Sequence, residues 1–549
     1  MKQQGIFSDR LPREPISRAK QLSNVITRRD FIAAATLAAS SHALFSQNSS
    51  NRLAHDRHRP QYHLMPPANW MNDPNGPIYW KGRYHMFYQY AEVISNSATK
   101  YWGHAVSNDM VHWKNLGIAL APTPGGPDKD GCWTGSAVVC NGVPTIVYTG
   151  ATWSQESEHA ARAEGFVPER QMVAVAADPN DLDLLNWNKI PQNPVLSAPP
   201  AGIKAVGWRD PCVWREGSDW YITIGCGEFG KGGMALLYTS KDLRNWKYLH
   251  PLAVANTHGP AMASRSMWEC PDFFILQDQP VLLVAADNMY LTGSYSNHYF
   301  HRHNEGRIDF GTAAYAQRTM KDHQGRRIWW AWLREKRSMK AQLEAGWAGV
   351  MSLPKNLTLH SNSMLSVAPV EELKVLRRRG HIVAPQKIDA SSPLLLKGVS
   401  GDCIEIDAEI DPGGAKQCGL RVRSTADGCE QTLIGYDRES QMLFSDTTRS
   451  SKDPETSSRI FTNRGITQGA LKLGTEPLRL RVFVDASVLE TFANGRACIS
   501  DRVYPLTAAS LGIGLFAQSG TARLRSMTVW DLTPISNDRL TSGAELFRV

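Results

Sequence analysis

Short apolar runs broken by glycine, proline, asparagine and aspartate follow one another from about Arg59 onward. These runs are rich in valine, isoleucine, tyrosine and tryptophan, and almost none shows a sustained period of 3.6 residues. Runs of this length and composition are typical of β-strands, so the pattern predicts an all-β protein. Clear examples are residues 84–90, 144–149, 171–177, 220–225, 234–239, 281–285 and 328–333.

The pattern changes after about Leu365, where apolar and polar residues largely alternate, as in 403–410, 478–484 and 522–530. A period of two residues indicates strands that are buried on one face, as in a β-sandwich. Residues 375–392 contain three consecutive arginines and look like a connection. Because 549 residues exceed one ordinary compact domain, we expect two domains.

A weak internal repeat accompanies the first pattern. Residues 107–113 and 240–246 share the form Ser-x-Asp, an apolar residue, two further residues and Trp, and residues 180–187 are a looser copy. A β-unit repeated at this spacing suits four-stranded propeller blades with loops of variable length. The alternative is that a common turn recurs by coincidence.

The N-terminal region has the character of a cleavable signal. Arg28 and Arg29 directly precede an apolar, alanine-rich stretch over residues 31–39, and small residues follow at 40–46. This order resembles a twin-arginine leader, and the stretch is shorter than the ~20 residues that span a bilayer. We therefore expect export to the periplasm or beyond, with no membrane anchor; the alternative is an amphipathic N-terminal helix.

The formal net charge is +8, but seven basic and three acidic residues among the first 46 account for half of it. The remainder is too small and too dispersed to favour a nucleic-acid partner. The nine cysteines lack the spacing of a zinc site, so we expect mostly buried free thiols. We interpret the histidines at 298, 301 and 303 as a surface loop, and we expect no metal.

Three short motifs place carboxylates beside aromatic residues: Trp70–Gly76 with Asp73, Trp208–Pro211 with Asp210, and Trp268–Phe274 with Glu269. Taken singly, they could be a tight turn, a loop salt bridge and a glutamate at a strand edge. A glutamate pressed against aromatic surface would have a raised pKa and could serve as an acid near neutrality.

Together, in this order, the motifs closely resemble glycoside hydrolase family 32, the invertases, levanases and inulinases. The resemblance continues through nearly the whole chain after the leader. It includes the segments at 102–107, 309–311, 346–354, 482–485 and 490–495, together with Tyr315.

The resemblance implies a retaining mechanism without a cofactor. Asp73 would be the nucleophile, Glu269 the acid/base, and Asp210 a permanently ionised carboxylate that holds fructose hydroxyls and stabilises the transition state. The substrate-binding residues that it implies are Trp70, Asn72, Gln89, Trp102, Trp133, Thr134, Arg209 and Tyr315.

One segment departs from the family pattern. The family usually continues its Gln-Tyr with Asn-Pro and soon a tryptophan near the leaving group, whereas here Tyr90 is followed by Ala91 and Glu92. The expected tryptophan position is about Ser97. This departure leaves specificity for the leaving group open.

The implied architecture is a five-bladed β-propeller followed by a β-sandwich, and the implied activity is cleavage of terminal β-fructofuranosides such as sucrose, inulin or levan. A fructosyltransferase that uses the same carboxylates is one alternative, and a non-catalytic fructan-binding protein is another. The expected segments are a leader at 1–46, the propeller at 58–366, a linker at 367–392, the sandwich at 393–535 and a tail at 536–549.

Overall fold

A computed structural model describes residues 53–152, 168–228, 230–255, 267–360, 364–453 and 465–536. The chain divides into two units, Met1–Arg52 and Leu53–Val549, and all described residues belong to the second. The expected leader at 1–46 therefore lies outside the described residues. Within them, no helix is long and apolar enough to cross a membrane.

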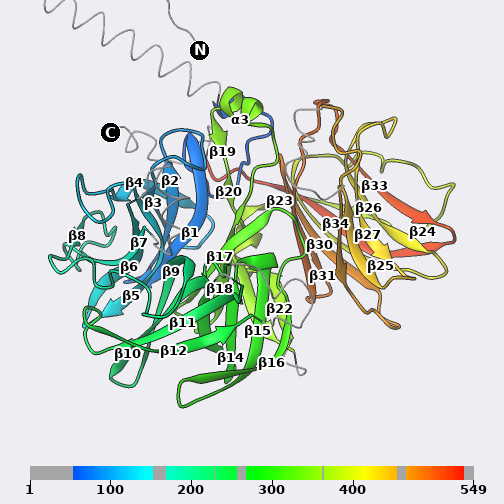
Figure 1. The fold of residues 1–549 in the computed structure, drawn as a ribbon. Coiled ribbons are helices and arrows are strands. Elements are labelled where there is room, and N and C mark those ends of the chain that lie inside the picture. The colour runs from blue at the N-terminus through cyan, green and yellow to red at the C-terminus, as the bar shows by residue number, and fades with distance from the viewer. Residues whose placement is uncertain are drawn as a thin grey trace, which may run out of the picture. The chain divides into compact units, whose positions relative to one another are not determined.

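Strands dominate the described chain, which confirms the all-β prediction (Figure 1). The first four sheets are each built from four consecutive antiparallel strands. The first holds β1 (Asn69–Trp80), β2 (Arg83–Ala91), β3 (Tyr101–Ser107) and β4 (Trp113–Leu120). The second holds β5 (Gly131–Cys140), β6 (Val143–Ala151), β7 (Glu169–Ala176) and β8 (Trp187–Lys189), and the third β9 (Ala205–Glu216), β10 (Asp219–Glu228), β11 (Gly232–Ser240) and β12 (Trp246–Val254). The fourth holds β13 (Asp272–Leu276), β14 (Gln279–Val284), β15 (Met289–Ser296) and β16 (Tyr299–Arg307).

A fifth sheet follows, with a short helix before its last three strands. Its members are β17 (Ala314–Lys321), β18 (Arg327–Leu333), β20 (Val350–Met351), β21 (Lys355–Leu359) and β22 (Leu365–Pro369). The helices nearby are η2 (Ala286–Asn288) and α3 (Met339–Ala345), and β19 (Trp347–Ala348) pairs with β1 of the first sheet.

The three copies of the repeat form the same local structure. In each copy the aspartate side chain accepts hydrogen bonds from backbone N–H groups of the turn, and the tryptophan indole donates to a carbonyl three residues earlier. Each copy joins the third and fourth strands of its sheet. The repeat is therefore structural, and coincidence of an isolated turn does not explain it.

The first strands of the five sheets contact one another in sequence: β1 with β5, β5 with β9, β9 with β13, and β13 with β17. β17 also contacts β1. The approach is closest at Gly76, where an added Cβ would lie 2.9 Å from the backbone nitrogen of Ala137 on β5. Glycine at this position lets the two first strands pack together.

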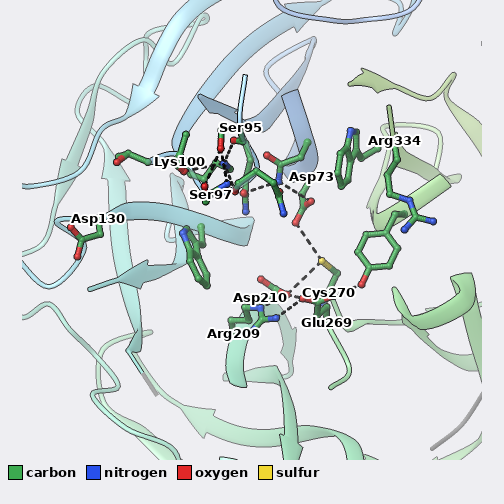
Figure 2. Close-up of a pocket in the computed structure, with 18 of the residues that line it drawn as sticks. Asp73, Ser95, Ser97, Lys100, Asp130, Arg209, Asp210, Glu269, Cys270 and Arg334 are labelled. Atoms are coloured by element: carbon green, nitrogen blue, oxygen red, sulfur yellow. Dashed lines mark hydrogen bonds and ion pairs between the residues drawn. The ribbon is translucent and has the colours of Figure 1, made fainter. Parts of the chain in front are cut away.

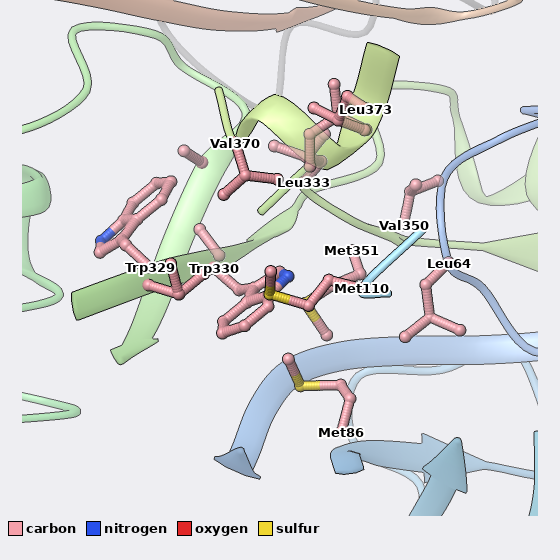
Figure 3. Packing of buried hydrophobic residues seen from close by; sticks show 14 of the residues in the cluster. Leu64, Met86, Met110, Trp329, Trp330, Leu333, Val350, Met351, Val370 and Leu373 are labelled. Atoms are coloured by element: carbon pink, nitrogen blue, oxygen red, sulfur yellow. The ribbon is translucent and has the colours of Figure 1, made fainter. Parts of the chain in front are cut away.

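The largest apolar core joins the first and fifth sheets to the segment that follows them (Figure 3). Met86 of β2 and Trp330 of β18 are fully buried there, together with Leu373 of η3 (Glu371–Leu376). Core residues at close-packed density tolerate little change in volume. The cluster therefore fixes the positions of the strands that contribute to it.

Two further sheets enclose a separate apolar core, to which both contribute strands. One contains β23 (Arg377–Val383), β24 (Gln386–Ile388), β25 (Cys403–Asp411), β30 (Leu478–Asp485), β31 (Val488–Ala493), β32 (Ala497–Arg502) and β34 (Ala522–Leu532). The other contains β26 (Gln417–Ser424), β27 (Thr432–Asp437), β28 (Met442–Asp446), β29 (Ile466–Ala470) and β33 (Gly512–Gln518).

The segment expected as a linker, 367–392, is largely ordered secondary structure. It contains η3 as well as β23 and β24, which both pair with β34. The backbone groups of β23 and β24 thus extend the sheet that contains β34. The first of the three consecutive arginines, Arg377 on β23, forms an ion pair with the buried Glu405 on β25.

Buried charges join the two regions. His63 contacts Asp485 at 2.7 Å and Glu490 at 3.0 Å, and Lys355 contacts Glu490 at 2.6 Å. Burial works to lower the pKa of His63, but its two carboxylate partners outweigh burial and raise the pKa. Each of these charges is paired. The network therefore holds the segment before β1, and strand β21, against the sheet that contains β30 and β31.

Candidate active site

The three carboxylates singled out in the sequence converge on one cavity (Figure 2). Asp73 lies on β1, Asp210 on β9, and Glu269 three residues before the start of β13. The Cys270 Sγ lies 3.8 Å from Oδ2 of Asp73 and 3.6 Å from Oδ2 of Asp210. The acidic groups of β1, β9 and the segment before β13 therefore lie together in the cavity.

The backbone at this point is unusual. Asp210 has φ +65° and Cys270 has φ +48°, a left-handed region that residues with a Cβ seldom occupy. Such conformations persist where the surrounding structure holds them. Here Thr149 accepts the backbone N–H of Asp210 at 2.9 Å, and Arg318 donates to its carbonyl at 3.0 Å.

The cavity has a volume of about 830 Å³, within the roughly 300–1,000 Å³ usual for small-molecule sites. Its lining combines buried polar groups with two indoles, a phenol and a loop of short side chains. The lining residues are Asn72, Asp73, Gln89, Ser95, Asn96, Ser97, Ala98, Thr99, Lys100, Asp130, Trp133, Arg209, Asp210, Glu269, Cys270, Tyr315, Trp332, Arg334 and Met339.

Asp73 is held by two neutral donors. Thr134 donates to Oδ2 at 2.6 Å, and the Asn72 amide donates to Oδ1 at 3.0 Å. Burial raises the pKa of Asp73, the negative charge of Glu269 adds to this effect, and the two hydrogen bonds oppose it. The motif that could have been a tight turn is part of strand β1, with irregular pairing on both sides of Pro74 and Asn75.

Asp210 also has a perturbed pKa. Burial raises its pKa from 3.8 to about 7, against the positive charge of Arg209 and with the support of the charges on Glu269 and Asp73. Its Oδ2 accepts the backbone N–H of Cys270 at 3.0 Å. The expectation of a permanently ionised Asp210 is therefore wrong for the free site, because desolvation outweighs its positive neighbours.

Glu269 is perturbed in the opposite direction. Burial would raise its pKa, but the charge of Arg209 and hydrogen bonds from Tyr315 and Arg209 outweigh burial and lower the pKa. Arg209 also donates to the buried Glu169 at 3.1 Å. The sequence predicted a raised pKa from the aromatic neighbours alone, which was wrong because it could not place the guanidinium.

Charges on neighbouring carboxylates contribute to the raised pKa values of Asp73 and Asp210. Raised pKa values at Asp73 and Asp210 mean that a proton bound to the free site resides mainly there. Carboxyl groups whose pKa values are shifted in opposite directions can take different protonation states at the same pH, which acid–base chemistry requires.

Five of the expected substrate-binding residues line the cavity: Asn72, Gln89, Trp133, Arg209 and Tyr315. Three do not line it, and each supports a residue that does. The indole of Trp70 donates to Asn72 at 2.8 Å, Thr134 binds Asp73, and the fully buried Trp102 donates to the carbonyl of Trp133 at 2.9 Å.

Several lining residues were missed from the sequence. Trp332 and Arg334 come from the end of β18 and the residues beyond it, and Arg334 lies 4.8 Å from the ring centre of Tyr315. Lys100 and the residues before it form another part of the wall. A lone lysine or arginine near an aromatic residue is too common a pattern to single out without coordinates.

Among the described residues, no group of three or more histidine, cysteine, aspartate or glutamate side chains could hold a metal ion. His298 instead contacts the hydroxyl of Tyr221 at 3.2 Å and lies 3.5 Å from Glu216. The nine cysteines are all free thiols.

Paired carboxyl groups in a sugar-sized cavity, one free to protonate a leaving group and one to attack or activate water, are the chemistry of a glycoside hydrolase. Two family models match in succession: the N-terminal domain of glycosyl hydrolases family 32 over residues 63–369, and the C-terminal domain of the same family over 372–531. The chain belongs to glycosyl hydrolase family 32.

Relatives of known activity agree with the family models. A sucrose-6-phosphate hydrolase of Escherichia coli is 33% identical over 86% of this chain and 94% of its own. A levanase of Bacillus subtilis is 32% identical over 90% and 74%. The crystal structure of fructan 1-exohydrolase IIa from Cichorium intybus superposes with a TM-score of 0.77 at 28% identity, covering 87% of this chain and 98% of that one.

Proposed function

We propose that this enzyme hydrolyses terminal β-D-fructofuranosyl residues of sucrose or fructans with retention of configuration. The convergence of Asp73, Asp210 and Glu269 on one cavity carries the proposal. The relatives support it, since sucrose-6-phosphate, levan and fructan all contain fructosyl units.

Asp73 is the nucleophile in this proposal. Thr134 and Asn72 each occupy one of its oxygens with a single neutral hydrogen bond, which orients the carboxylate and leaves further lone pairs for attack. No cationic donor contacts Asp73 among the described residues, so its negative charge is not neutralised by an ion pair before attack on the anomeric carbon.

Glu269 is the acid/base. Its side chain is 29% exposed, whereas that of Asp210 is 5% exposed, so Glu269 is the group that can exchange protons with solvent between the two steps. Asp210 binds sugar hydroxyls from deeper in the cavity. It becomes ionised when its proton passes to Glu269, and its contacts then strengthen as the sugar gains positive charge.

We further propose that the five N-terminal sheets are the blades of a closed five-bladed propeller and that the two C-terminal sheets form a β-sandwich. The contacts between successive first strands, including β17 with β1, support closure. The repeated aspartate–tryptophan turns between third and fourth strands support a repeated blade. The domain limits are proposed at 58–366 and 393–535, and β23 and β24 of the segment between them pair with β34 of the sandwich.

Export through a twin-arginine route is proposed from residues 28–39. Replacing Arg28 and Arg29 by lysine should retain the protein in the cytoplasm of the expressing cell, whereas the parent chain should reach the periplasm or medium. Equal distribution of the two proteins between the fractions would reject the proposal.

The hydrolytic proposal is tested with Asp73→Asn and Glu269→Gln. Both variants should lose nearly all turnover of sucrose, and Glu269→Gln should retain turnover of fructosides whose leaving group needs little protonation. Asp278→Asn is the matched control, because Asp278 is exposed in the turn between β13 and β14 and should keep full activity. An active Asp73→Asn variant would refute the nucleophile, and oligosaccharides in place of free fructose would indicate transfer.

A further inference from the structure

Lys100 is a buried lysine that binds backbone carbonyls. It directly precedes β3, is only 4% exposed, and its Nζ donates to the carbonyls of Ser95 at 3.2 Å, Asn96 at 2.9 Å and Ala98 at 3.0 Å. An ammonium group has three N–H donors, so these carbonyls use all of them. Among the described residues, no carboxylate lies within ion-pair distance of this Nζ.

The backbone of Lys100 is fixed independently of its side chain. It forms a bridge with Gly131, and its carbonyl accepts the N–H of Cys132 at 2.8 Å, at the start of β5. At the other end of the loop, Ile94 is buried beside Trp70. The ammonium thus ties the loop over 95–99 to a rigid edge of the site, through charge-assisted hydrogen bonds.

The other hydrogen bonds of the loop are local. Its side chains are short, and the N–H of Ser95 donates to the carbonyl of Val93 at 3.0 Å and that of Ala98 to the carbonyl of Ser95 at 3.4 Å. The N–H of Ser97 donates to the Ser95 hydroxyl at 3.3 Å, and the two serine hydroxyls lie 3.0 Å apart. All of residues 95–99 nevertheless line the cavity. The shape of this wall therefore depends on the Lys100 contacts.

The wall lies at the mouth of the cavity. Asn96, Ser97 and Thr99 are exposed, whereas Asn72 and Asp210 at the other end are buried. Figure 2 places Lys100, Ser95 and Ser97 together to one side of Asp73. A sugar unit held by the buried carboxylates leaves the rest of the substrate to extend through the mouth, past this loop.

We propose that Lys100 is a positioning residue that holds residues 95–99 as the wall against which the leaving group rests, and so sets the preference among leaving groups. The inference rests on the proposed function, because it assumes a fructosyl unit at the buried end. Lys100 itself does not react; it acts through the carbonyls of the loop.

Lys100→Met tests this by removing all three donors while keeping an unbranched side chain. The KM for sucrose, whose leaving group is a whole sugar, should rise about tenfold with little change in kcat, since small displacements of binding groups have effects of this order. For methyl β-D-fructofuranoside, whose leaving group is too small to reach the wall, kcat/KM should stay within about twofold. Lys114→Met, at an exposed position on β4, should change neither substrate.

The ratio of kcat/KM for sucrose to kcat/KM for methyl β-D-fructofuranoside separates this role from a loss of folding. A partly unfolded enzyme loses activity on both substrates equally, which leaves the ratio unchanged. If Lys100→Met does not fold, Lys100→Gln retains two donors and should shift the ratio in the same direction by less. If a folded Lys100→Met variant keeps the ratio of the parent enzyme, the inference is overturned. Failure of the unaltered enzyme to cleave either fructoside would instead refute the proposed function.

Discussion

Replacing Asp210 by asparagine should make the protein more stable at alkaline pH while it abolishes activity. The side chain is almost fully buried, and its pKa is raised from 3.8 to about 7. The folded state therefore keeps a proton on Asp210 over a range of pH in which the unfolded chain has lost it. The stability that this proton provides is complete below pH 3.8 and is lost as the pH rises through about 7.

The size of the effect follows from the shift. A difference of about three pKa units corresponds to ~4 kcal/mol between the protonated and ionised forms. Asparagine is neutral at every pH and still offers an oxygen to the N–H of Cys270, so the variant should not pay this cost. At roughly 2.1 cal/mol/K per residue, 549 residues unfold with an entropy near 1.1 kcal/mol/K, which makes the difference in Tm about 4 °C.

The assay is thermal unfolding of the parent and Asp210→Asn proteins at intervals from pH 4 to pH 8.5. The two Tm values should nearly coincide at pH 4 and separate in favour of the variant between pH 5 and pH 8. Asp278→Asn should follow the parent throughout. A gap in Tm that does not depend on pH, or a variant that is less stable at pH 8, would refute the reasoning that burial governs Asp210.

Two further substitutions test other contacts. Tyr315→Phe removes a hydrogen-bond donor from the Glu269 carboxylate, so kcat/KM for sucrose should fall about tenfold or more. The limb of the pH profile that belongs to Glu269 should move to higher pH. Tyr299→Phe, outside the cavity, should leave the pH profile unchanged. Glu490→Gln leaves the buried Lys355 and His63 each short of a partner, and the free energy of unfolding should fall by ~3–5 kcal/mol. The exposed pair between Lys416 and Glu439 is the comparison for Glu490, since breaking it by Glu439→Gln should leave the free energy of unfolding nearly unchanged in a denaturant titration.

Much of the fold was predictable because the evidence for it is local. Strand lengths, turn residues and the aspartate–tryptophan repeat all act over a few residues, and each repeat folds into the same turn. The three motifs whose carboxylates line the cavity could be singled out for a similar reason, since each keeps its carboxylate next to characteristic neighbours. The alternation after Leu365 likewise identified strands with one buried face.

The electrostatics of the site could not be predicted in this way. Whether Glu269 or Asp210 carries the raised pKa depends on Arg209, which is adjacent to Asp210 in sequence but donates its hydrogen bonds to Glu269 and Glu169. The role of Lys100 depends on the path of a loop, and that of Trp102 on a carbonyl 31 residues away. Contacts that depend on the course of a loop or on pairing between distant strands leave no pattern of spacing in a single sequence.

The central claim is that Asp73 forms a covalent fructosyl intermediate, which water then attacks from the opposite side. Two displacements at the anomeric carbon retain its configuration, whereas direct attack by water would invert it. The most direct measurement is NMR of the fructose released from sucrose at early times, before the anomers equilibrate. The account predicts β-fructofuranose as the first product, and initial release of the α-anomer would contradict it.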